Sequence, residues 1–472
     1  MMLILFLFIV LVPAVFLSHR RRRKSPSDIP LLHPLSAFTA LPILIPTLLG
    51  RRNTTIHRAH VRHGPIVRLS PTEISISSPA ALSAVYTSFP KHPWYNIFRN
   101  YGAAPMFAIL PGREHAARKK LLAAAYSNSA VLKSSVLRRT ANETLPVLLK
   151  ELANSQGREL EVWMVFVRLT MDFITASLFT RDVGSRFLDG GDQHILELYH
   201  SRRAFFALSS ELPWLARWIV PKWVDDANDK LEAWCRDLCD RRRRQWRQGD
   251  EECSLDRLIS AGLPEVDAAS EMLDHIGAGH ETTALALAFI LVAMSERPEL
   301  QRELRESLEP LMEVRDGWKL PKLDGEGLEE HGLLNAVIKE SLRLYTPIPG
   351  SQPRVAPKDL EILGHIVPAG TAVSAQAWSL HRDPAVWKDH ETFFPERWLG
   401  EEKKAEMERA WWAFGSGGRG CIGRYLATWE MRVVVASVYA NFETECNGAA
   451  AVLDAYTTAP LGEKVGVVFR KV

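Results

Sequence analysis

The feature that most constrains this chain is a glycine-rich segment near its C-terminal end. Five glycines fall within the nine positions 415–423, and they let the backbone fold where side chains would clash. Cys421 lies inside this segment, and a helical pattern of apolar residues begins at Tyr425. The N–H groups and the dipole at a helix N-terminus stabilise a thiolate. The segment therefore predicts a backbone cradle that holds one thiolate against a flat ligand.

The residues at fixed spacing around Cys421 are Phe414, Gly417, Arg419 and Gly423. This pattern resembles the haem-binding signature of the cytochrome P-450 superfamily at every fixed position. The resemblance implies that Cys421 binds the iron of haem b as a thiolate, which favours O–O cleavage. It also implies that Phe414, Arg419 and Gly423 hold the cofactor. The alternative from the residues alone is a buried structural cysteine after a flexible loop.

A second segment, Ala278-Gly279-His280-Glu281-Thr282-Thr283, lies within a helix predicted from about Val266 to Arg297. It resembles the oxygen-binding helix of the same superfamily, which implies that Ala278 and Gly279 approach the haem. Glu281 and Thr282 would then deliver protons during catalysis. The alternative is that Thr282 bonds back to its own helix. Glycines at 277 and 279 each cost about 1 kcal/mol in a helix, so they predict a close approach, such as that of a ligand.

Basic residues supply a third match. His115 and Lys119 resemble the positions where the family binds haem propionates, although the family usually has Arg in place of Lys119 and Arg118 is an alternative. Arg354 resembles a strand arginine with the same role, and Arg419 would complete the set. Two carboxylates beside a buried iron need such partners.

Further along the chain, Glu340, Arg343 and Arg397 resemble a structural network of the family, and we expect them to form a buried brace.

The five cysteines are few and odd in number, which argues against a disulfide framework and for a reducing compartment. Cys235 and Cys239 share a helix face without a nearby histidine, so we expect them to be packing residues.

The N-terminus predicts where the protein lies. Residues 2–17 form an apolar run, and residues 20–24 are all basic. Because the charge follows the run, we expect a signal anchor rather than a cleaved peptide, with the rest of the chain cytosolic. The resulting division is a membrane anchor and basic stop at 1–24, a proline-rich hinge at 25–50 and a haem-thiolate monooxygenase domain at 51–472. The expected location is the endoplasmic reticulum membrane, in single-pass form.

The charge balance excludes one class of partner. The net charge is +3, but residues 1–24 carry five basic residues and no acid, so the rest of the chain carries −2. Nucleic-acid binding needs a basic body, and we expect none. The sequons at Asn53 and Asn142 would not be used in a cytosolic domain.

The resemblance covers roughly residues 30–470 and implies a mainly α-helical fold with a small β region. Ile66–Ser70 and Ala372–Ala375 are expected strands. No flavin domain fits after Cys421, so electrons would come from NADPH through a separate flavoprotein reductase. The implied reaction inserts one atom of O₂ into a hydrophobic small molecule.

The residues that surround Cys421 and His115 are most similar to those of filamentous-fungal members of the family. This similarity favours a role in secondary metabolism. The substrate stays open between fatty acids, terpenoids and polyketide-derived molecules. Three alternatives remain: a haem-thiolate enzyme that rearranges or dehydrates peroxides without a reductase, a haem-based gas sensor, and a membrane scaffold without haem.

Overall fold

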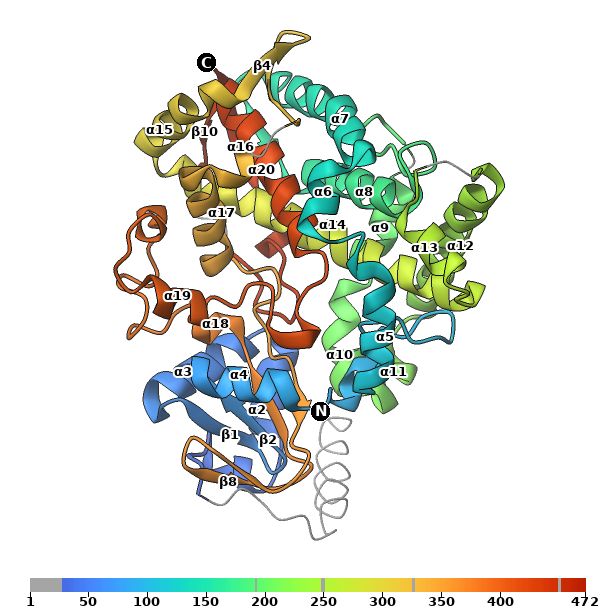
Figure 1. The fold of residues 1–472 in the computed structure, drawn as a ribbon. Coiled ribbons are helices and arrows are strands. Elements are labelled where there is room, and N and C mark those ends of the chain that lie inside the picture. Colours follow the sequence, from blue (N-terminus) through green and yellow to red (C-terminus); the bar gives the residue numbers. More distant parts are fainter. Residues whose placement is uncertain (1–27, 192, 248–250, 325–326, 449–450) are drawn as a thin grey trace.

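The computed structural model describes residues 28–191, 193–247, 251–324, 327–448 and 451–472. The anchor predicted for residues 1–24 lies outside these residues. The described chain is mainly helical, with the largest sheet at one end and most helices at the other, where smaller sheets that include β4 and β10 also lie (Figure 1). This is the expected fold class. The α-helices are α2 (Leu41–Leu48), α3 (Arg52–His63), α4 (Pro79–Ser88), α5 (Gly112–Ala123), α6 (Asn128–Lys133), α7 (Ser135–Ala153), α8 (Trp163–Phe179), α9 (His194–Ser201), α10 (Phe206–Glu211), α11 (Pro213–Ile219), α12 (Lys222–Gln245), α13 (Ser254–Ser260), α14 (Glu265–Ser295), α15 (Pro298–Leu308), α16 (Gly327–Glu330), α17 (Gly332–Leu344), α18 (Ala377–Leu380), α19 (Lys404–Ala410) and α20 (Arg424–Asn441). The short 3₁₀ helices are η1 (Pro34–Ala37), η2 (Pro93–Phe98), η3 (Arg203–Phe205), η4 (Glu309–Leu311), η5 (Pro395–Trp398), η6 (Gly417–Arg419) and η7 (Leu461–Glu463).

The helix α14 forms the centre of the helical part. Residues 283–294 of this helix are all buried, which is typical of a helix surrounded by protein. It contacts α8, α12, α17 and α20. It is also the one helix of the described residues that is long and apolar enough to cross a membrane, yet 72% of its most apolar window is buried inside the protein. It is therefore the core helix of the fold.

The largest sheet joins distant parts of the chain in the order β1-β2-β9-β6. β1 and β2 pair antiparallel, and β2 pairs with β9 in parallel, with Ile74 opposite Val373. The predicted strands at Ile66–Ser70 and Ala372–Ala375 are confirmed as β1 and β9. The strands are β1 (Ile66–Ser70), β2 (Glu73–Ile76), β3 (Glu159–Glu161), β4 (Met312–Arg315), β5 (Trp318–Pro321), β6 (Arg354–Val355), β7 (Leu360–Ile362), β8 (His365–Val367), β9 (Ala372–Ala375), β10 (Phe442–Glu445) and β11 (Gly466–Lys471).

The segment expected to be a proline-rich hinge contains the two short helices η1 and α2. Pro42 stands in the first turn of α2, where a missing N–H costs nothing. Ile43 of α2 is buried in a small core with Ile56 and Leu69. The described part of the hinge, residues 28–50, is therefore packed against α3 and β1.

The brace predicted around Glu340 is confirmed. Arg343 binds both oxygens of the Glu340 carboxylate at 2.9 and 3.0 Å, and the Nε atom of Arg397 reaches Oε1 at 3.0 Å. The indole of Trp398 donates to Oε2 at 2.9 Å. Glu340 and Arg343 are fully buried, which an ion pair tolerates only when its hydrogen bonds are satisfied. The brace fastens α17 to η5, which is followed by α19 and then by the glycine-rich segment.

Candidate functional site

The glycine-rich segment forms a tight loop that contains η6 and leads directly into α20. The backbone N–H of Cys421 donates to the carbonyl of Phe414 at 2.8 Å, which closes the loop. Gly417 has a φ of +68°, and a Cβ atom there would lie 2.7 Å from the carbonyl oxygen of Tyr86 in α4. A side chain at 417 would both strain the backbone and push α4 away. The loop therefore needs glycine here to bring Cys421 into position.

The Cys421 side chain is exposed, and the other residues of the loop are exposed or half-buried. Its surroundings act in two directions on the pKa of the thiol. Burial among protein atoms raises this pKa, whereas the backbone N–H of Gly423 and the charges of Lys119 and Arg424 lower it, with a net rise. A group that binds the sulfur as a thiolate, such as a metal ion, would supply the missing stabilisation.

An open stripe interrupts the buried surface of α14. Ala278 is exposed and Asp274 and Thr282 are half-buried, although the second half of the helix is almost wholly buried. Residues four apart share one helix face, so these three side chains form one line. We define Asp274, Ala278 and Thr282 as the open stripe.

Tyr126 connects this stripe with the cysteine loop. Its ring lies 3.9 Å from the position that a Cβ atom of Gly423 would take, and its hydroxyl is 2.7 Å from Nδ1 of His275. Burial raises the pKa of Tyr126, and Cys421 and Asp274 both contribute to the rise. Tyr126 therefore lies close both to the loop that carries Cys421 and to the part of α14 that carries the open stripe.

Glu281 and Thr282, which we expected to work together, have different surroundings. The Oγ1 atom of Thr282 donates to the carbonyl of Ala278 at 2.7 Å, as in the alternative considered from the sequence. Glu281 forms an ion pair with Arg203 at 2.9 Å, and His200 lies 3.7 Å away. Burial alone would raise the pKa of Glu281, but Arg203 and the nearby histidines lower it overall. Glu281 is therefore held as a carboxylate.

Gly277 and Gly279 differ in how much space surrounds them. A Cβ atom at Gly279 would lie 2.6 Å from Cγ1 of Ile174 in α8, so the close approach there is made by a neighbouring helix. A Cβ atom at Gly277 would meet only Tyr199, at 3.9 Å. The predicted close approach therefore exists at Gly279, where α8 packs closely against α14.

Five basic residues gather beside the cysteine loop: Lys91, His115, Lys119, Arg354 and Arg419. Burial and the charges of its neighbours Arg419 and Arg354 lower the pKa of Lys91 to about 6, and burial and the same group lower that of His115 to about 3. Lys91 and Arg354 are joined by an isolated β-bridge. None of the five forms an ion pair with an acidic side chain in the described part of the chain. We call this group the basic cluster.

Individual contacts in the basic cluster show where each side chain lies. Lys119 donates to the carbonyls of Gly418 and Gly420 at 3.0 Å each, and Arg419 donates to those of Ile109 and Leu110 at 2.8 and 2.9 Å. Arg354 is buried, and its Nε atom has no hydrogen-bond partner. Such an arrangement has a deficit of negative charge, which a ligand with carboxylate groups would correct.

Arg118, the alternative to Lys119, lies elsewhere. Its guanidinium binds Glu271 at 2.5 Å and Asp267 at 3.3 Å, both on α14. Lys119 is thus the member of this pair that contacts the cysteine loop.

Sequence reasoning missed Lys91, Arg203 and Asp274. Each is an ordinary polar residue whose partners come from distant elements, and no local pattern marks it. It also missed an aromatic group in which Trp94 and Phe206 pack on Tyr456, with ring centroids 4.9 and 6.1 Å from that of Tyr456. This group joins η2, α10 and the C-terminal loop.

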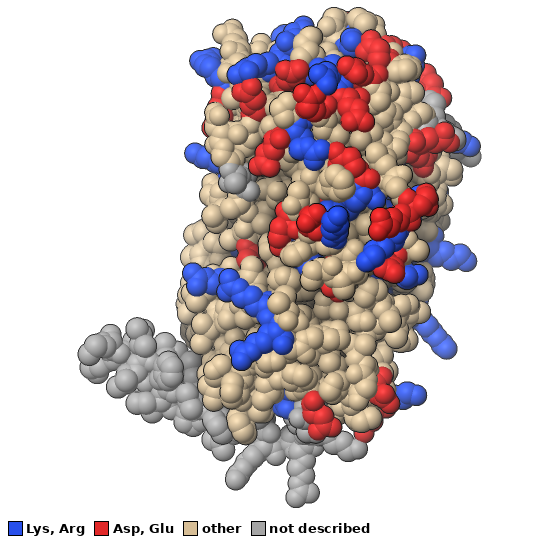
Figure 2. Space-filling view, turned by 90° about the vertical axis from the view of Figure 1, so that its left-hand side faces the viewer, with Lys and Arg blue, Asp and Glu red and all other residues tan. Residues whose placement is uncertain are grey.

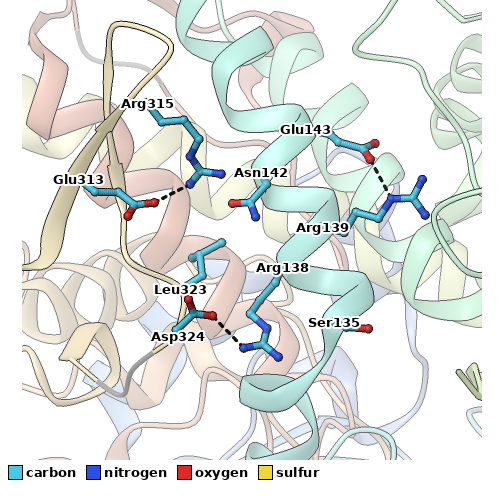
Figure 3. A pocket seen from close by; sticks show the side chains of 9 residues that line it. All are labelled: Ser135, Arg138, Arg139, Asn142, Glu143, Glu313, Arg315, Leu323 and Asp324. Carbon is cyan, nitrogen blue, oxygen red and sulfur yellow. Dashed lines mark hydrogen bonds and ion pairs between the residues drawn. The ribbon is translucent and has the colours of Figure 1, made fainter.

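A surface pocket of about 630 Å³ lies between α7 and the β4–β5 hairpin (Figure 3). Its arginines are already paired: Arg138 with Asp324, Arg139 with Glu143, and Arg315 with Glu313. It shares no residue with the site around Cys421, and its charges are balanced.

Comparison with known proteins gives consistent matches. The cytochrome P-450 family model matches residues 38–464. The cytochrome P-450 monooxygenase avaI of Aspergillus versicolor is 29% identical over 78% of this chain and 92% of its own. The fusicoccadiene C-8 hydroxylase of Alternaria brassicicola is 28% identical over 86% of this chain and 84% of its own. A crystal structure of a cytochrome P-450 superposes with a TM-score of 0.78 at 20% identity, and covers 95% of this chain and all of that one.

Proposed function

The chain belongs to the cytochrome P-450 family and is a haem-thiolate monooxygenase, and we propose that it oxidises a hydrophobic small molecule of fungal secondary metabolism. The observation that carries this proposal is the exposed Cys421 on a closed glycine loop, close to the open stripe of α14. We take the space between Cys421 and the open stripe to be the haem pocket, and we call it the hollow. Haem bound through a thiolate supplies the chemistry that activates O₂.

The residues around the hollow fit a haem. Cys421 would bind the iron, while Phe414 and Gly423 border the loop and Ala278 and Gly279 stand on the facing helix. The basic cluster would hold the two propionates, since it gathers His115, Lys119, Arg354 and Arg419 with no acid paired to them. Lys91 joins this set as a residue that the family pattern did not mark.

Other side chains of this protein would deliver the protons that the reaction needs. Thr282 offers a hydroxyl on the open stripe, and Glu281 is a carboxylate that can accept a proton and pass it on. Arg203 connects Glu281 to the exposed Glu463, which lies 3.5 Å from Arg203. We propose that Arg203 keeps Glu281 in position as a carboxylate and that Glu281 passes protons to Thr282.

A separate NADPH-dependent flavoprotein reductase would supply the electrons. We further propose that residues 1–24 anchor the chain in the endoplasmic reticulum membrane with residues 51–472 cytosolic. Exposed apolar side chains support membrane contact: Phe38 and Leu49 lie beside α2, and Trp218 lies on α11. The helix α10 contacts both α2 and α11, so these side chains belong to one end of the molecule.

The peroxide-rearranging and gas-sensing alternatives are not favoured. The curated relatives are named as monooxygenases and a hydroxylase, and the Glu281–Thr282 pair, which delivers protons, would serve neither alternative. A membrane scaffold would not need the cysteine loop.

An absorbance spectrum of the reduced, CO-treated protein tests the haem-thiolate assignment. We expect a strongly red-shifted Soret band in the wild-type protein and its loss, together with all turnover, in Cys421→Ala. Cys446→Ala serves as the control, because Cys446 lies between β10 and the C-terminal loop and should not affect the band. A red-shifted band that persists in Cys421→Ala would contradict the assignment.

A further inference from the structure

Three side chains of the kinds that bind metal ions converge in the N-terminal half of α14. Glu271, Asp274 and His275 each offer one oxygen or nitrogen atom, and these atoms all lie within 4.8 Å of one another. Residues three and four apart on a helix share one face, so a single helix gathers all three. Glu271 and His275 are buried, and Asp274 is half-buried. We call these three residues the acid–histidine cluster.

Two atoms of this cluster are buried without a hydrogen-bond partner among the described residues. They are Oε2 of Glu271 and Nε2 of His275, and they lie 3.8 Å apart. That distance is too long for a hydrogen bond. Two ligands of one zinc ion, each about 2.0–2.2 Å from the metal, lie about 3–4 Å apart. Because buried polar atoms without partners are costly, this pair is suited to an ion that both atoms can bind.

The other atoms of these two side chains have the contacts that orient metal ligands. Nδ1 of His275 lies 2.7 Å from the hydroxyl of Tyr126, and a proton on Nδ1 leaves the lone pair of Nε2 available. Burial lowers the pKa of His275 to about 4, which keeps the ring neutral, as a metal ligand must be. Oε1 of Glu271 accepts hydrogen bonds from Arg118 at 2.5 Å and from the backbone N–H of Met106 at 2.8 Å. Oε2 of Glu271 therefore stays free for a metal ion.

The charges around the cluster favour a divalent cation. Three carboxyl groups lie there, those of Asp267, Glu271 and Asp274, and the cation that contacts them within the described chain is Arg118. Lys91 also faces Asp274, but burial lowers the pKa of Lys91 to about 6, so it is mostly neutral above that pH. Three carboxylates and one guanidinium leave two negative charges, which one divalent ion balances.

We infer that Glu271, Asp274 and His275 bind one zinc ion, apart from the haem, through Oε2, a carboxylate oxygen and Nε2. Imidazole nitrogen and carboxylate oxygen are both usual ligands of zinc, and the fourth position of a tetrahedral ion then takes a water molecule. The ion ties α14 to Tyr126 through His275 and to Arg118 of α5 through Glu271. This site does not depend on the reaction that the haem supports.

The test uses the full-length, haem-loaded protein without an affinity tag. The protein is treated with EDTA and then dialysed at pH 8 against graded concentrations of zinc chloride, and zinc and iron are counted by elemental analysis. The pH is chosen because burial and the neighbouring Glu271 raise the pKa of Asp274 to about 8, so zinc displaces the proton of Asp274 more easily there. We expect the wild type to bind one zinc ion for each haem iron.

Three variants and one control locate the ion. Glu271→Gln and His275→Gln each remove a ligand and should weaken zinc binding more than Tyr126→Phe does. Tyr126→Phe keeps all three ligands but removes the hydroxyl at Nδ1 of His275, and it should weaken binding about 10–100-fold. His280→Gln is the matched control and should bind zinc like the wild type, because His280 is a buried histidine of the same helix whose Nδ1 contacts the carbonyl of Ile276.

Three outcomes of the dialysis would overturn the zinc site. They are a wild type that binds no stoichiometric zinc, an affinity that is the same in Glu271→Gln and His275→Gln as in the wild type, and an equal loss of affinity in His280→Gln.

X-ray absorption at the zinc edge identifies the ligands without any variant, so it decides the question even where a variant fails to fold. We expect nitrogen and oxygen ligands at about 2.0–2.2 Å and no sulfur. A sulfur ligand at about 2.3 Å would place the zinc on a cysteine and overturn the assignment. The reduced CO spectrum of the same samples tests the thiolate separately. A normal CO band without zinc would therefore count against the zinc site alone, and bound zinc without the red-shifted band against the proposed function alone.

Discussion

Glu281 and Thr282 are neighbours in the sequence, but the structure gives them different partners. Thr282 faces the hollow and bonds to its own helix, whereas Glu281 turns toward Arg203 and His200. A hydroxyl that bonds to a backbone carbonyl can still rotate and accept a hydrogen bond from a neighbour. The geometry therefore allows Thr282 both a structural and a catalytic role, and kinetics can separate the two.

We predict that Thr282→Ala keeps its haem and still consumes NADPH and O₂, but forms less product and releases hydrogen peroxide instead. The reason is the loss of a positioned proton donor, which typically contributes 10²–10⁴-fold. NADPH use, peroxide and product are measured together. Thr283→Val is the matched control, because Thr283 is buried away from the open stripe. Unchanged product per NADPH in Thr282→Ala would remove this residue from the mechanism.

We predict that Arg203→Ala raises the pKa of Glu281, because burial would then act without its main opposing charge. The lowered pKa stabilises the native state above the pKa of Glu281 in the unfolded chain, and this stability is lost as the pH falls through the lower native value. The variant should therefore be less stable at neutral pH, and the acid limb of its product-formation profile should move to higher pH. Arg203→Lys keeps the charge and should restore most of the wild-type profile. Identical profiles for wild type and Arg203→Ala would show that the ion pair does not control Glu281.

At the level of elements, the sequence of α14 is constrained by the helices packed around it as well as by the site. Its extent, Glu265–Ser295, was predictable to within two residues because the apolar pattern is long and Pro298 follows it. The reason for Gly279 was not predictable, because Ile174 lies more than a hundred residues away and no local signal indicates that α8 packs there. The small helix α2 was missed for a related reason. Its prolines suggest an extended chain, and only the core around Ile43 shows that the segment is folded.

We predict that Gly279→Ala lowers the stability of the holoenzyme by about 1–3 kcal/mol, since the new methyl group would overlap Ile174. Gly277→Ala is the matched control, and it should be neutral or stabilising because alanine favours helices and there is space around it. Apparent melting temperatures at one scan rate measure both effects.

The partner of Gly279 gives an independent check. Ile174→Ala alone should destabilise by leaving a cavity, but the double variant Gly279→Ala with Ile174→Ala should be more stable than the sum of the two single effects. Additive effects would show that the two helices do not limit each other at this point.

On the scale of the whole molecule, the two ends differ in surface chemistry. Figure 2 shows charged side chains gathered over the helical end of the face it presents, and fewer of them toward the end that carries the sheet. Exposed apolar residues of α2 and α11 belong to this less charged end. The proposed membrane contact thus rests on a sequence signal at residues 1–24 and on a surface that only the folded chain brings together.

We predict that deletion of residues 1–24 releases part of the protein from membranes and leaves the CO spectrum unchanged. The release should be incomplete, because the apolar end of the domain remains. Combining the deletion with Trp218→Ser should increase the soluble fraction further, since this side chain is 76% exposed. Cell fractionation measures both variants. Full-length protein found mainly in the soluble fraction would contradict the anchor.

The parallel pairing of β2 with β9 has a consequence for how the protein is made. About 300 residues separate the two strands, so at about 5–20 residues per second a ribosome needs roughly 15–60 s to deliver the partner of β2. Throughout that time the β1–β2 hairpin has an unpaired edge, which other chains could bind. The cysteine loop, which packs on α4 through Gly417, emerges later still. Recombinant yield should therefore depend on chaperones that cover this hairpin during translation, and on haem supply only once synthesis is nearly complete.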